Sequence, residues 1–402
     1  MINSHDWGRQ IQMSFYSGPV PFVPEGATVS KNWKQLGWNP IQSGDCYGNG
    51  SKVIEHRNDG KVLYIRCIPM QWPLKNVPGE CEFECWFRLE GNLAHVTSRL
   101  TNKRPDKTQY PARTQELPAV YTNGSWYKLV SYQGDRPFTG AKPTVLVDRG
   151  DGKGWPWRNF YSPEHWVALL DARDTGLGLY LPGACGFTGG FAGGDRKKGS
   201  GGPKSGQTGY MGVTIREVLD HDIVFTYDYT LIVGSLKDIR DHVYEREEKR
   251  TLPRWAFKND RQHWICQNTT DASWPIRGAL RVKLGPKNAV LVGPKTFWRA
   301  DDARALVLRG SFSTPERKAR ALLQPYDKLA AGDWAQWGDE RAKRPKPAPP
   351  VAVDFDIKGD GTERVYRIDL AGKPGYRGGM TQVRIQLPSG KGWAAVYAVE
   401  LQ

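Results

Sequence analysis

The strongest constraint on the fold is a strand-like alternation that recurs along the first two thirds of the chain. In "CEFECWFRLEGNLAHVTSRLTN" (Cys81–Asn102), apolar residues occupy every second position of the first half, and Glu90-Gly91-Asn92 interrupts the run. Successive side chains of a strand point to opposite faces, so the pattern predicts two antiparallel strands joined by a turn. Cys81, Phe83 and Cys85 are expected to share one face.

Comparable alternation recurs at residues 61–72, 166–183 and 222–236, whereas helical periodicity is scarce. The first candidate helix spans Ser235–Arg250, where a serine stands at the N-cap position before a charged run. The second candidate helix is Thr314–Leu329. A chain with many strands and two short helices is predicted to be all-β, with antiparallel sheets that pack face to face.

The chain is too long for one ordinary hydrophobic core. It has 402 residues, and single cores stop growing at about 250–300 residues. A second set of alternating strands begins after Arg277, separated by Gly-Asp-Gly, Lys-Pro-Gly and Ser-Gly-Lys-Gly turns. We therefore predict a large β-sandwich over residues 1–250, a linking segment over residues 251–276 and a smaller β-sandwich over residues 277–402.

The net charge of +15 raises the question of an acidic partner. Between Arg277 and Lys346 there are 16 Lys and Arg residues against 7 Asp and Glu residues, so much of the excess lies in one later stretch. Such a stretch either steers a polyanion or solvates a face, and we favour the solvated face. The sequence contains no nucleic-acid-reading motif and no run of 18 apolar residues, so neither nucleic acid nor a membrane is an expected partner. No pattern predicts an oligomeric state.

Six cysteines are present, at positions 46, 67, 81, 85, 185 and 266. No Cys-x-x-Cys pair and no Cys/His spacing typical of a metal site occurs among them. We interpret the cysteines as small buried apolar residues, with disulfides left open. The sequence predicts no metal and no cofactor.

A single carboxylate stands in the ring-rich stretch "YPARTQELPAVYTNGSWYKL" (Tyr110–Leu129). Asn123-Gly124 predicts a β-hairpin there, because both residues tolerate positive φ. Two prolines flank Glu116, and since proline donates no ladder hydrogen bond, the segment is expected at a sheet edge or in a loop. Binding and catalytic groups are often held at such places. Glu116 is therefore the first catalytic candidate, and the alternative is a structural ion pair with Arg113.

Aromatic residues are abundant, with 16 tryptophans and 17 tyrosines. Indole and phenol rings stack on the C–H faces of sugars, so they suit a protein that binds carbohydrate. The candidate platforms are Trp38, Trp72, Trp126, Trp155, Trp157 and Trp166. The glycine-rich stretch Gly183–Gly212 has few apolar anchors and no phosphate-loop pattern, so it is interpreted as a mobile flap at the rim of the pocket.

Several phrases resemble a group of bacterial, usually secreted, β-rich proteins associated with polysaccharide breakdown. They are "INSHDWGRQIQMSFYSGP", "WNPIQSGDCYGNGSKV", "NVPGECEFECWFRLEG" and "QYPARTQELPAVYTNG". The organisation of that group is similar to the galactose-mutarotase-like supersandwich, and "GDGTERVYRIDLAGKPGYRGGMTQVRI" resembles jelly-roll modules found beside carbohydrate-active domains. The resemblance implies an all-β fold, with a large antiparallel β-supersandwich followed by a smaller jelly-roll β-sandwich. It also implies a secreted or periplasmic location, with a leader that is not part of this chain.

The function predicted from these residues is a glycoside hydrolase that cleaves a polysaccharide or oligosaccharide by carboxylate acid–base catalysis. Glu116 is the predicted proton donor, because burial beside rings would raise its pKa. Asp45, in the glycine turn "QSGDCYGN", is the predicted second carboxylate, and its alternative role is to cap that turn. Substrate-binding candidates are Arg113, Gln115, Tyr47, Tyr110, Tyr121, Trp126, Asp6, Arg9 and Lys52. For Asp6 and Arg9 a plain salt bridge is the alternative.

Two other functions stay open. A polysaccharide lyase acting on a uronate-containing polymer would use Tyr110 or His95 as its base, with Arg113 or Lys52 neutralising the uronate. This alternative suits the positive net charge. A glycan-binding protein without catalysis would account for the rings but not for the polar residues around Glu116. Mutarotase activity is a distant alternative, because the histidines do not match the pattern that mutarotases use.

Overall fold

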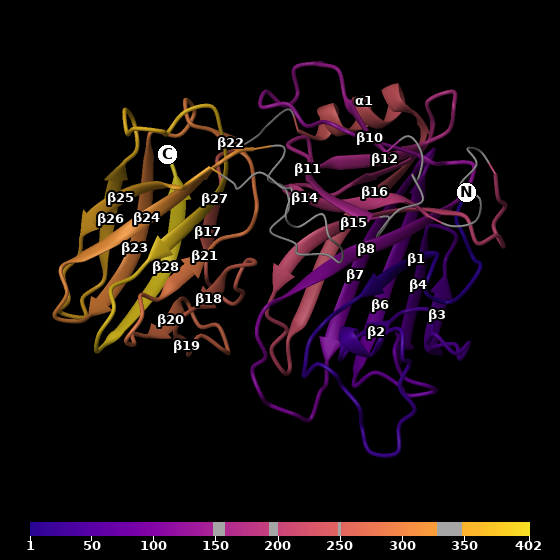
Figure 1. Ribbon diagram of the computed structural model, residues 1–402, viewed down its shortest axis with the longest axis horizontal. Helices are drawn as coiled ribbons and strands as arrows, with labels where there is room; N and C mark the ends of the chain where they lie inside the picture. Colours follow the sequence, from indigo (N-terminus) through magenta and orange to yellow (C-terminus); the bar gives the residue numbers. More distant parts are fainter. Residues whose placement is uncertain (148–156, 193–199, 248–250, 328–347) are drawn as a thin grey trace. The chain divides into compact units, whose positions relative to one another are not determined.

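The computed structural model describes residues 1–147, 157–192, 200–247, 251–327 and 348–402. These residues form two compact units, the first extending to Glu247 and the second beginning at Thr251. Both units consist of antiparallel sheets, and strands dominate the described chain (Figure 1). The predicted all-β fold is therefore confirmed. None of the helices within the described ranges is long and apolar enough to cross a membrane.

The first unit contains a seven-stranded sheet and a nine-stranded sheet. The seven-stranded sheet has the order β11 (Trp157–Tyr161), β14 (Gly186–Ala192), β15 (Thr208–Glu217), β8 (Arg113–Asn123), β1 (Ile11–Ser14), β2 (Pro40–Ile41) and β5 (Met70–Gln71). The nine-stranded sheet has the order β10 (Thr144–Val147), β9 (Lys128–Ser131), β12 (Trp166–Leu170), β13 (Thr175–Tyr180), β16 (Val224–Ser235), β7 (Leu93–Asn102), β6 (Cys81–Glu90), β4 (Val62–Ile68) and β3 (Lys52–Asn58). A 3-10 turn, η1 (Lys34–Leu36), lies between β1 and β2 in the sequence.

Aromatic side chains from both sheets meet in the core of the first unit. Phe15, directly after β1, is fully buried and its ring centroid lies 5.4 Å from that of Phe83 on β6 and 5.9 Å from that of Phe225 on β16. The ring of Tyr227, also on β16, lies 6.4 Å away. Phe15 therefore joins the seven-stranded sheet to the middle of the nine-stranded sheet.

The hairpin predicted from Cys81–Asn102 is confirmed. β6 and β7 pair in continuous register around Gly91, which adopts a positive φ of 57°. Cys81, Phe83 and Cys85 are all buried on one face, as the alternation indicates. All six cysteines are free, so no disulfide crosslinks the sheets.

The predicted hairpin at Asn123-Gly124 is wrong. β8 ends at Asn123 and β9 begins at Lys128, but β8 pairs with β1 and β15 in the seven-stranded sheet, whereas β9 pairs with β10 and β12 in the nine-stranded sheet. The turn therefore carries the chain from one sheet to the other. A turn sequence specifies a reversal of direction, and it does not specify which strand the chain pairs with afterwards.

The segment around Glu116 is not an edge or a loop, as its prolines predicted, but part of a central strand. β8 is flanked by β1 and β15, and Pro118 lies where the register with both neighbours shifts by one residue. A bulge is the place where a central strand tolerates a residue that donates no ladder hydrogen bond. The extra residue also reverses the alternation, so Glu116 and Tyr121 point to the same face.

The flap predicted at Gly183–Gly212 is largely wrong as well. Its two ends form β14 and the start of β15, and Phe187, Phe191 and Tyr210 are buried. These three buried rings fix the segment in the sheet, although its high glycine content suggested a mobile loop. Residues 193–199 of the predicted flap lie outside the described residues.

The helix predicted from Ser235 onward is confirmed as α1 (Leu236–Arg246), and it packs on β16, β13 and β12 (Figure 1). Ser235 and Asp238 form a reciprocal capping box, and Ile239 and Val243 are fully buried. The helix predicted at Thr314–Leu329 is wrong, because Lys318–Pro325 forms strand β24. In β24 the buried residues alternate, which the dense charges of the sequence concealed.

Replacing Ser235 by alanine should lower the free energy of unfolding by about 1 kcal/mol, the usual cost of losing an N-cap. The Ser235 side chain accepts a hydrogen bond from the Asp238 backbone N–H, which would lose its partner. Chemical denaturation measures the change, and Lys237→Ala, at a solvent-facing position of the same turn, is the control. Equal stability of the two variants would contradict a stabilising cap.

The second unit is a sandwich of two six-stranded sheets. One sheet contains β19 (Thr270–Asp271), β20 (Leu280–Lys283), β28 (Trp393–Leu401), β23 (Ala305–Ser313) and β26 (Arg364–Asp369), with β17 (Arg254–Ala256) also paired to β28. The other contains β18 (Ile265–Gln267), β21 (Val290–Val292), β27 (Gly379–Gln386), β24 and β25 (Val351–Asp356), with β22 (Trp298–Arg299) paired to β27.

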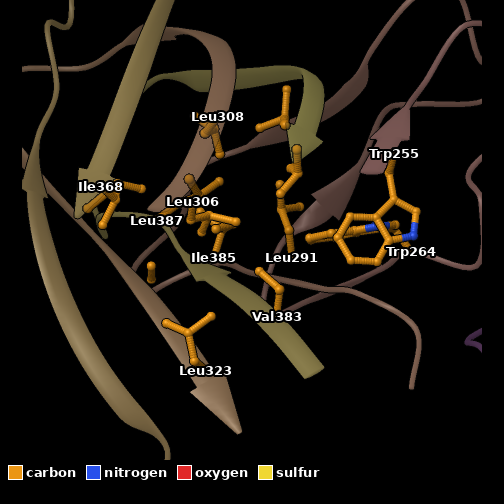
Figure 2. Packing of buried hydrophobic residues seen from close by; sticks show 14 of the residues in the cluster. Trp255, Trp264, Leu291, Leu306, Leu308, Leu323, Ile368, Val383, Ile385 and Leu387 are labelled. Atoms are coloured by element: carbon orange, nitrogen blue, oxygen red, sulfur yellow. The ribbon is translucent and has the colours of Figure 1, made fainter. Parts of the chain in front are cut away.

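The second unit has its own core and begins earlier than predicted. Figure 2 shows Trp255 beside Trp264, with Leu291 and Val383 next to them. Trp255 lies on β17 and Trp264 directly precedes β18, so the segment 251–276 is not a linker but supplies strands and core residues. The sequence concealed this because these strands are only two or three residues long, too short for a periodic pattern.

Candidate functional site

One face of the seven-stranded sheet gathers most of the polar and aromatic groups of interest. Met13 and Phe15 point into the core, so Ser14 between them points to the opposite, outer face. The register then aligns outer-face residues in three rows. They are Ser14–Glu116–Thr214, Gln12–Ala119–Gly212–Thr188–Asn159 and Tyr121–Tyr210–Gly190–Trp157. We call these rows the Glu116 face.

Glu116 is the acidic residue within these rows. Its carboxylate Oε2 accepts a 2.6 Å hydrogen bond from the Tyr210 hydroxyl. Burial raises the pKa of Glu116, and the Tyr210 hydrogen bond offsets part of that rise. Among the described residues no cation forms a salt bridge with Glu116, so the structural ion pair with Arg113 that the sequence left open is not formed. Desolvation without a nearby counter-ion favours the protonated form of a carboxyl group, which is the direction that a proton donor requires.

Three aromatic rings form a wall beside Glu116. The Tyr210 ring lies 4.7 Å from the Tyr121 ring and 4.9 Å from the Trp157 ring, measured between centroids. Tyr210 reaches Glu116 because it lies over Gly212, where an added Cβ would come within 2.8 Å of the Tyr210 hydroxyl. Gly212 has no side chain, and this leaves the space that the Tyr210 hydroxyl needs to reach Glu116.

Buried polar atoms without partners lie in the same rows. Thr188 and Thr214 are 1% and 5% exposed, and within the described residues neither hydroxyl has a hydrogen-bond partner. The Asn159 side-chain oxygen is also unpartnered there. Thr214 stands opposite Glu116 and Thr188 stands opposite Asn159 in the register. Buried polar groups normally have partners, so three unpartnered polar atoms in these rows set the Glu116 face apart from an ordinary sheet face.

The predicted pair Asp6 and Arg9 adjoins this face. Arg9 Nε lies 3.4 Å from Asp6 Oδ2, and Arg9 also donates to the carbonyls of Ser205 and Gly206. Burial raises the pKa of Tyr121 well above its ordinary value, Glu116, Tyr16 and Asp6 raise it further, and Arg9 lowers it. Asp6 and Arg9 thus form the salt bridge that the sequence allowed and also act on the Tyr121 hydroxyl.

Arg113 and Gln115 position Tyr16, which the sequence analysis did not select. The Gln115 side chain accepts from the Tyr16 backbone N–H at 2.6 Å and donates to its carbonyl at 2.8 Å. The Arg113 guanidinium lies 5.3 Å from the Tyr16 ring centroid and donates to the Leu36 carbonyl. Burial and the Glu116 charge raise the pKa of Tyr16. Arg113 and Gln115 therefore support the site from behind rather than facing a ligand.

Asp45 has the alternative role, that of a turn cap. Its Oδ1 accepts from the backbone N–H groups of Tyr47 and Asn49, and its Oδ2 accepts from the Asn49 side chain and the Asn76 backbone N–H. With four donors and 1% exposure, this carboxylate holds two loops together. Its prediction as the partner of Glu116 is therefore not retained. Tyr47, two residues further along this turn, is 41% exposed, and its predicted role in substrate binding stays a prediction.

Four other predicted residues lie apart from the Glu116 face. The Tyr110 hydroxyl donates to Asp106, which raises the pKa of Tyr110 and makes it a poor base. His95 lies on β7 of the other sheet, where it contacts Thr230. Lys52 begins β3, the edge strand of the nine-stranded sheet, and Trp126 packs beside Gly176 of β13. The bases predicted for a lyase are thus not gathered at one site.

The structure also sorts the candidate sugar platforms. Trp38 and Trp166 are fully buried, Trp157 belongs to the Glu116 face, and Trp72 packs against Gly8. Trp155 lies outside the described residues. The sequence analysis did not select Tyr16 or Tyr210 as site residues. The only signal for Tyr210 was its position between two glycines, in "TGYMG" (residues 208–212). In the described part of the chain, no group of three or more His, Cys, Asp or Glu residues could hold a metal ion.

Comparison with known proteins gives only distant similarity. No protein-family model matches the sequence, and no curated protein matches it at a significant level. An α-galactosidase from Lactobacillus brevis is 11% identical with a TM-score of 0.29, over 46% of this chain and 25% of the galactosidase. A glycoside hydrolase family 43 arabinoxylan arabinofuranohydrolase from Bacillus subtilis is 10% identical with a TM-score of 0.27, over 88% and 66% of the two chains.

A family 11 carbohydrate-binding module of a Clostridium thermocellum cellulase is 8% identical with a TM-score of 0.22, over 38% of this chain and 95% of the module. The chain spans only a quarter of the length of the α-galactosidase. Similarity at this level carries no argument about activity. The functional conclusion therefore depends on the residues of the Glu116 face.

Replacing Tyr210 by phenylalanine should raise the pKa of Glu116, and it should move the high-pH limb of any activity that depends on protonated Glu116 to higher pH. The Tyr210 hydrogen bond lowers the pKa of Glu116, so its loss leaves burial unopposed and raises that pKa. An acid with a higher pKa stays protonated to higher pH, and kcat/KM at the optimum should stay within about tenfold because the proton donor remains. Tyr47→Phe, at an exposed tyrosine, is the control. An unmoved limb would show that Glu116 is not the titrating acid.

Proposed function

We propose that the protein is a carbohydrate-active enzyme, a glycoside hydrolase whose site is the Glu116 face. The observation that supports this proposal is the environment of Glu116. Within the described ranges, its desolvated carboxyl group has no counter-ion, and it lies next to three aromatic rings and to buried threonine hydroxyls without hydrogen-bond partners. Rings suit the C–H faces of a sugar, and the threonines and Asn159 suit its hydroxyl groups.

In the proposed reaction Glu116 donates its proton to the oxygen of the glycosidic bond as that bond breaks. A second carboxylate acts on water or on the sugar. We assign this role to Asp6 in place of Asp45, because the charge of Asp6 acts on the Tyr121 hydroxyl, while both Asp45 oxygens accept hydrogen bonds from its own turn and from Asn76. Arg9 forms an ion pair with Asp6, with Nε 3.4 Å from Oδ2.

Incubation with a panel of neutral and uronate-containing polysaccharides tests the proposal. Hydrolysis releases reducing ends without the absorbance of an unsaturated sugar, whereas a lyase produces both. Reducing ends without that absorbance, lost in the Glu116→Gln variant, support the hydrolase. Absorbance that survives in Glu116→Gln would favour a lyase, and binding without any product would favour a glycan-binding protein.

Asp6→Asn and Asp45→Asn form a matched pair of variants. We expect Asp6→Asn to lower kcat by at least about 100-fold with little change in stability, because its side chain is partly exposed and acts in the reaction. Asp45→Asn should lower the free energy of unfolding by about 1–3 kcal/mol, since two donors to Oδ2 would face an amide N–H₂. Kinetics and denaturant midpoints of both variants decide. The reverse pattern would return the catalytic role to Asp45.

A further inference from the structure

The second unit presents an exposed sheet face on which cations surround aromatic rings. Leu280, Val282 and Phe312 point into the core, so the residues that alternate with them point outward. Four rows in register cross this face. They are Lys283–Trp393–Ser313, Arg281–Ala395–Ser311, Ala398–Arg309–Val365 and Arg254–Glu400–Val307–Arg367. We call these rows the Trp393 face.

The centre of the Trp393 face is aromatic. Trp393, at the start of β28, is 42% exposed. Further along the same strand, Tyr397 occupies the extra position of a bulge, and its hydroxyl lies 3.0 Å from that of Ser311. The Arg309 guanidinium lies 5.4 Å from the Tyr397 ring centroid. Two rings thus lie along one strand, with Lys283 and Arg281 on the neighbouring strand β20 and Arg309 on the other neighbour, β23.

The charges of the Trp393 face are unbalanced. Lys283 stands opposite Trp393 and Arg281 stands opposite Ala395, so neither cation has a carboxylate across the strand. Arg281 donates instead to the backbone carbonyls of Arg277 and Ala279. Arg309 does pair with Glu363, at 2.9 Å. Arg367 likewise pairs with Asp369, at 3.5 Å, and Arg254 stands opposite Glu400. Among the described residues, the uncompensated positive charge of the four rows therefore lies at Lys283 and Arg281.

The outer face of the opposite sheet is built differently. Arg320 stands opposite Asp354 and bonds both of its carboxylate oxygens, and Lys318 stands opposite Asp356. Cations that only solvate a sheet are commonly balanced across the strands in this way. The two outer faces of one sandwich therefore differ, and only the Trp393 face combines uncompensated cations with an exposed indole.

We propose that the Trp393 face binds an anionic polysaccharide through its carboxylate or sulfate groups. Trp393 and Tyr397 take the C–H faces of two sugar units along the strand, while Lys283, Arg281 and Arg309 take the anionic groups on either side. This proposal explains where part of the +15 net charge acts. It does not depend on the activity proposed for the Glu116 face, because the two sites lie in different units.

Binding to the full-length Glu116→Gln variant tests the proposal without turnover. The probes are polygalacturonate, a sulfated carrageenan, neutral galactomannan and double-stranded DNA, each measured by tryptophan fluorescence and by retardation in native gels. We expect binding of polygalacturonate or carrageenan but not of galactomannan. Tighter binding of polygalacturonate would identify carboxylate as the preferred anionic group, and tighter binding of carrageenan would identify sulfate. Affinity should fall as salt rises, since the charges are exposed.

Three variants in the same background locate the surface. Trp393→Ala should weaken polyanion binding at least tenfold, and Arg281→Gln/Lys283→Gln should weaken it and flatten its salt dependence. Lys318→Gln/Arg320→Gln, which removes the same number of cations from the opposite sheet, is the matched control and should bind like its parent. Thermal unfolding checks that all variants are folded.

Unchanged binding in Trp393→Ala, or an equal loss in the control variant, would overturn the proposal. Tight binding of galactomannan would also overturn it, because the cations would then not select the ligand. DNA binding that is as tight as polygalacturonate binding and insensitive to Trp393 would show general attraction of polyanions by the net charge.

Discussion

Replacing Glu116 by glutamine is expected to lower kcat by about 10²–10⁴-fold, the usual contribution of a positioned proton donor. The amide retains the shape of the side chain and its hydrogen bond with Tyr210, but it has no acidic proton to transfer. KM should change much less than kcat, because the rings and threonines that would hold the sugar remain. Steady-state kinetics on the best substrate of the polysaccharide panel measures both constants.

Glu84→Gln is the matched control for that experiment. The Glu84 carboxylate also accepts a hydrogen bond from a tyrosine, Tyr64 at 2.9 Å, but it lies on β6 of the nine-stranded sheet and approaches Arg99 to 3.6 Å. It should leave kcat unchanged. Full activity of Glu116→Gln would contradict the assignment of the acid.

Glu116→Gln has a second, opposite effect on stability. Burial raises the pKa of Glu116 in the folded protein, so the stability that its protonated form contributes is present below the unfolded pKa and is lost as pH rises through the folded pKa. Glutamine does not ionise, so the variant does not lose this stability as pH rises. The variant should therefore gain stability relative to the wild type on the alkaline side of that range, as denaturant midpoints across pH would show.

Replacing Phe15 by alanine should lower the free energy of unfolding by about 3–5 kcal/mol. The Phe15 ring is fully buried and contacts Phe83, Phe225 and Tyr227, so its removal leaves a cavity between the two sheets of the first unit. Urea denaturation followed by tryptophan fluorescence measures the loss. Leu89→Ala, at a strand position that is 77% exposed, should change stability by less than about 0.5 kcal/mol.

A loss in Phe15→Ala no larger than in Leu89→Ala would mean that the two sheets are joined mainly elsewhere. If one unfolding transition shifts to lower urea in Phe15→Ala while a second transition stays in place, the two units unfold separately. Each unit has its own core, which makes separate transitions an informative outcome of the same measurement.

The local sequence was enough to select Glu116, but it also selected Asp45, which the structure shows to be a turn-capping residue. Glu116, Tyr121, Asp6 and Arg9 were selected from their local surroundings, and in the structure Glu116, Asp6 and Arg9 all act electrostatically on the Tyr121 hydroxyl. Asp45 was selected on the same grounds, but Asn76, far along the chain, supplies one of the donors that make it a structural group. The sequence around Asp45 does not indicate that Asn76 will lie next to it in the fold.

The sequence alone determined the strand content and the buried face of strands such as β6, because a period of two assigns alternate side chains to opposite faces. It also determined the capping of α1, which depends on residues three positions apart. Only the tertiary structure decided that β8 is central, that Asn123-Gly124 joins two sheets, and that Tyr210 meets Glu116. The physical reason is that strand pairing and a one-residue bulge are chosen by partners distant in the chain, and a bulge reverses which side chains share a face.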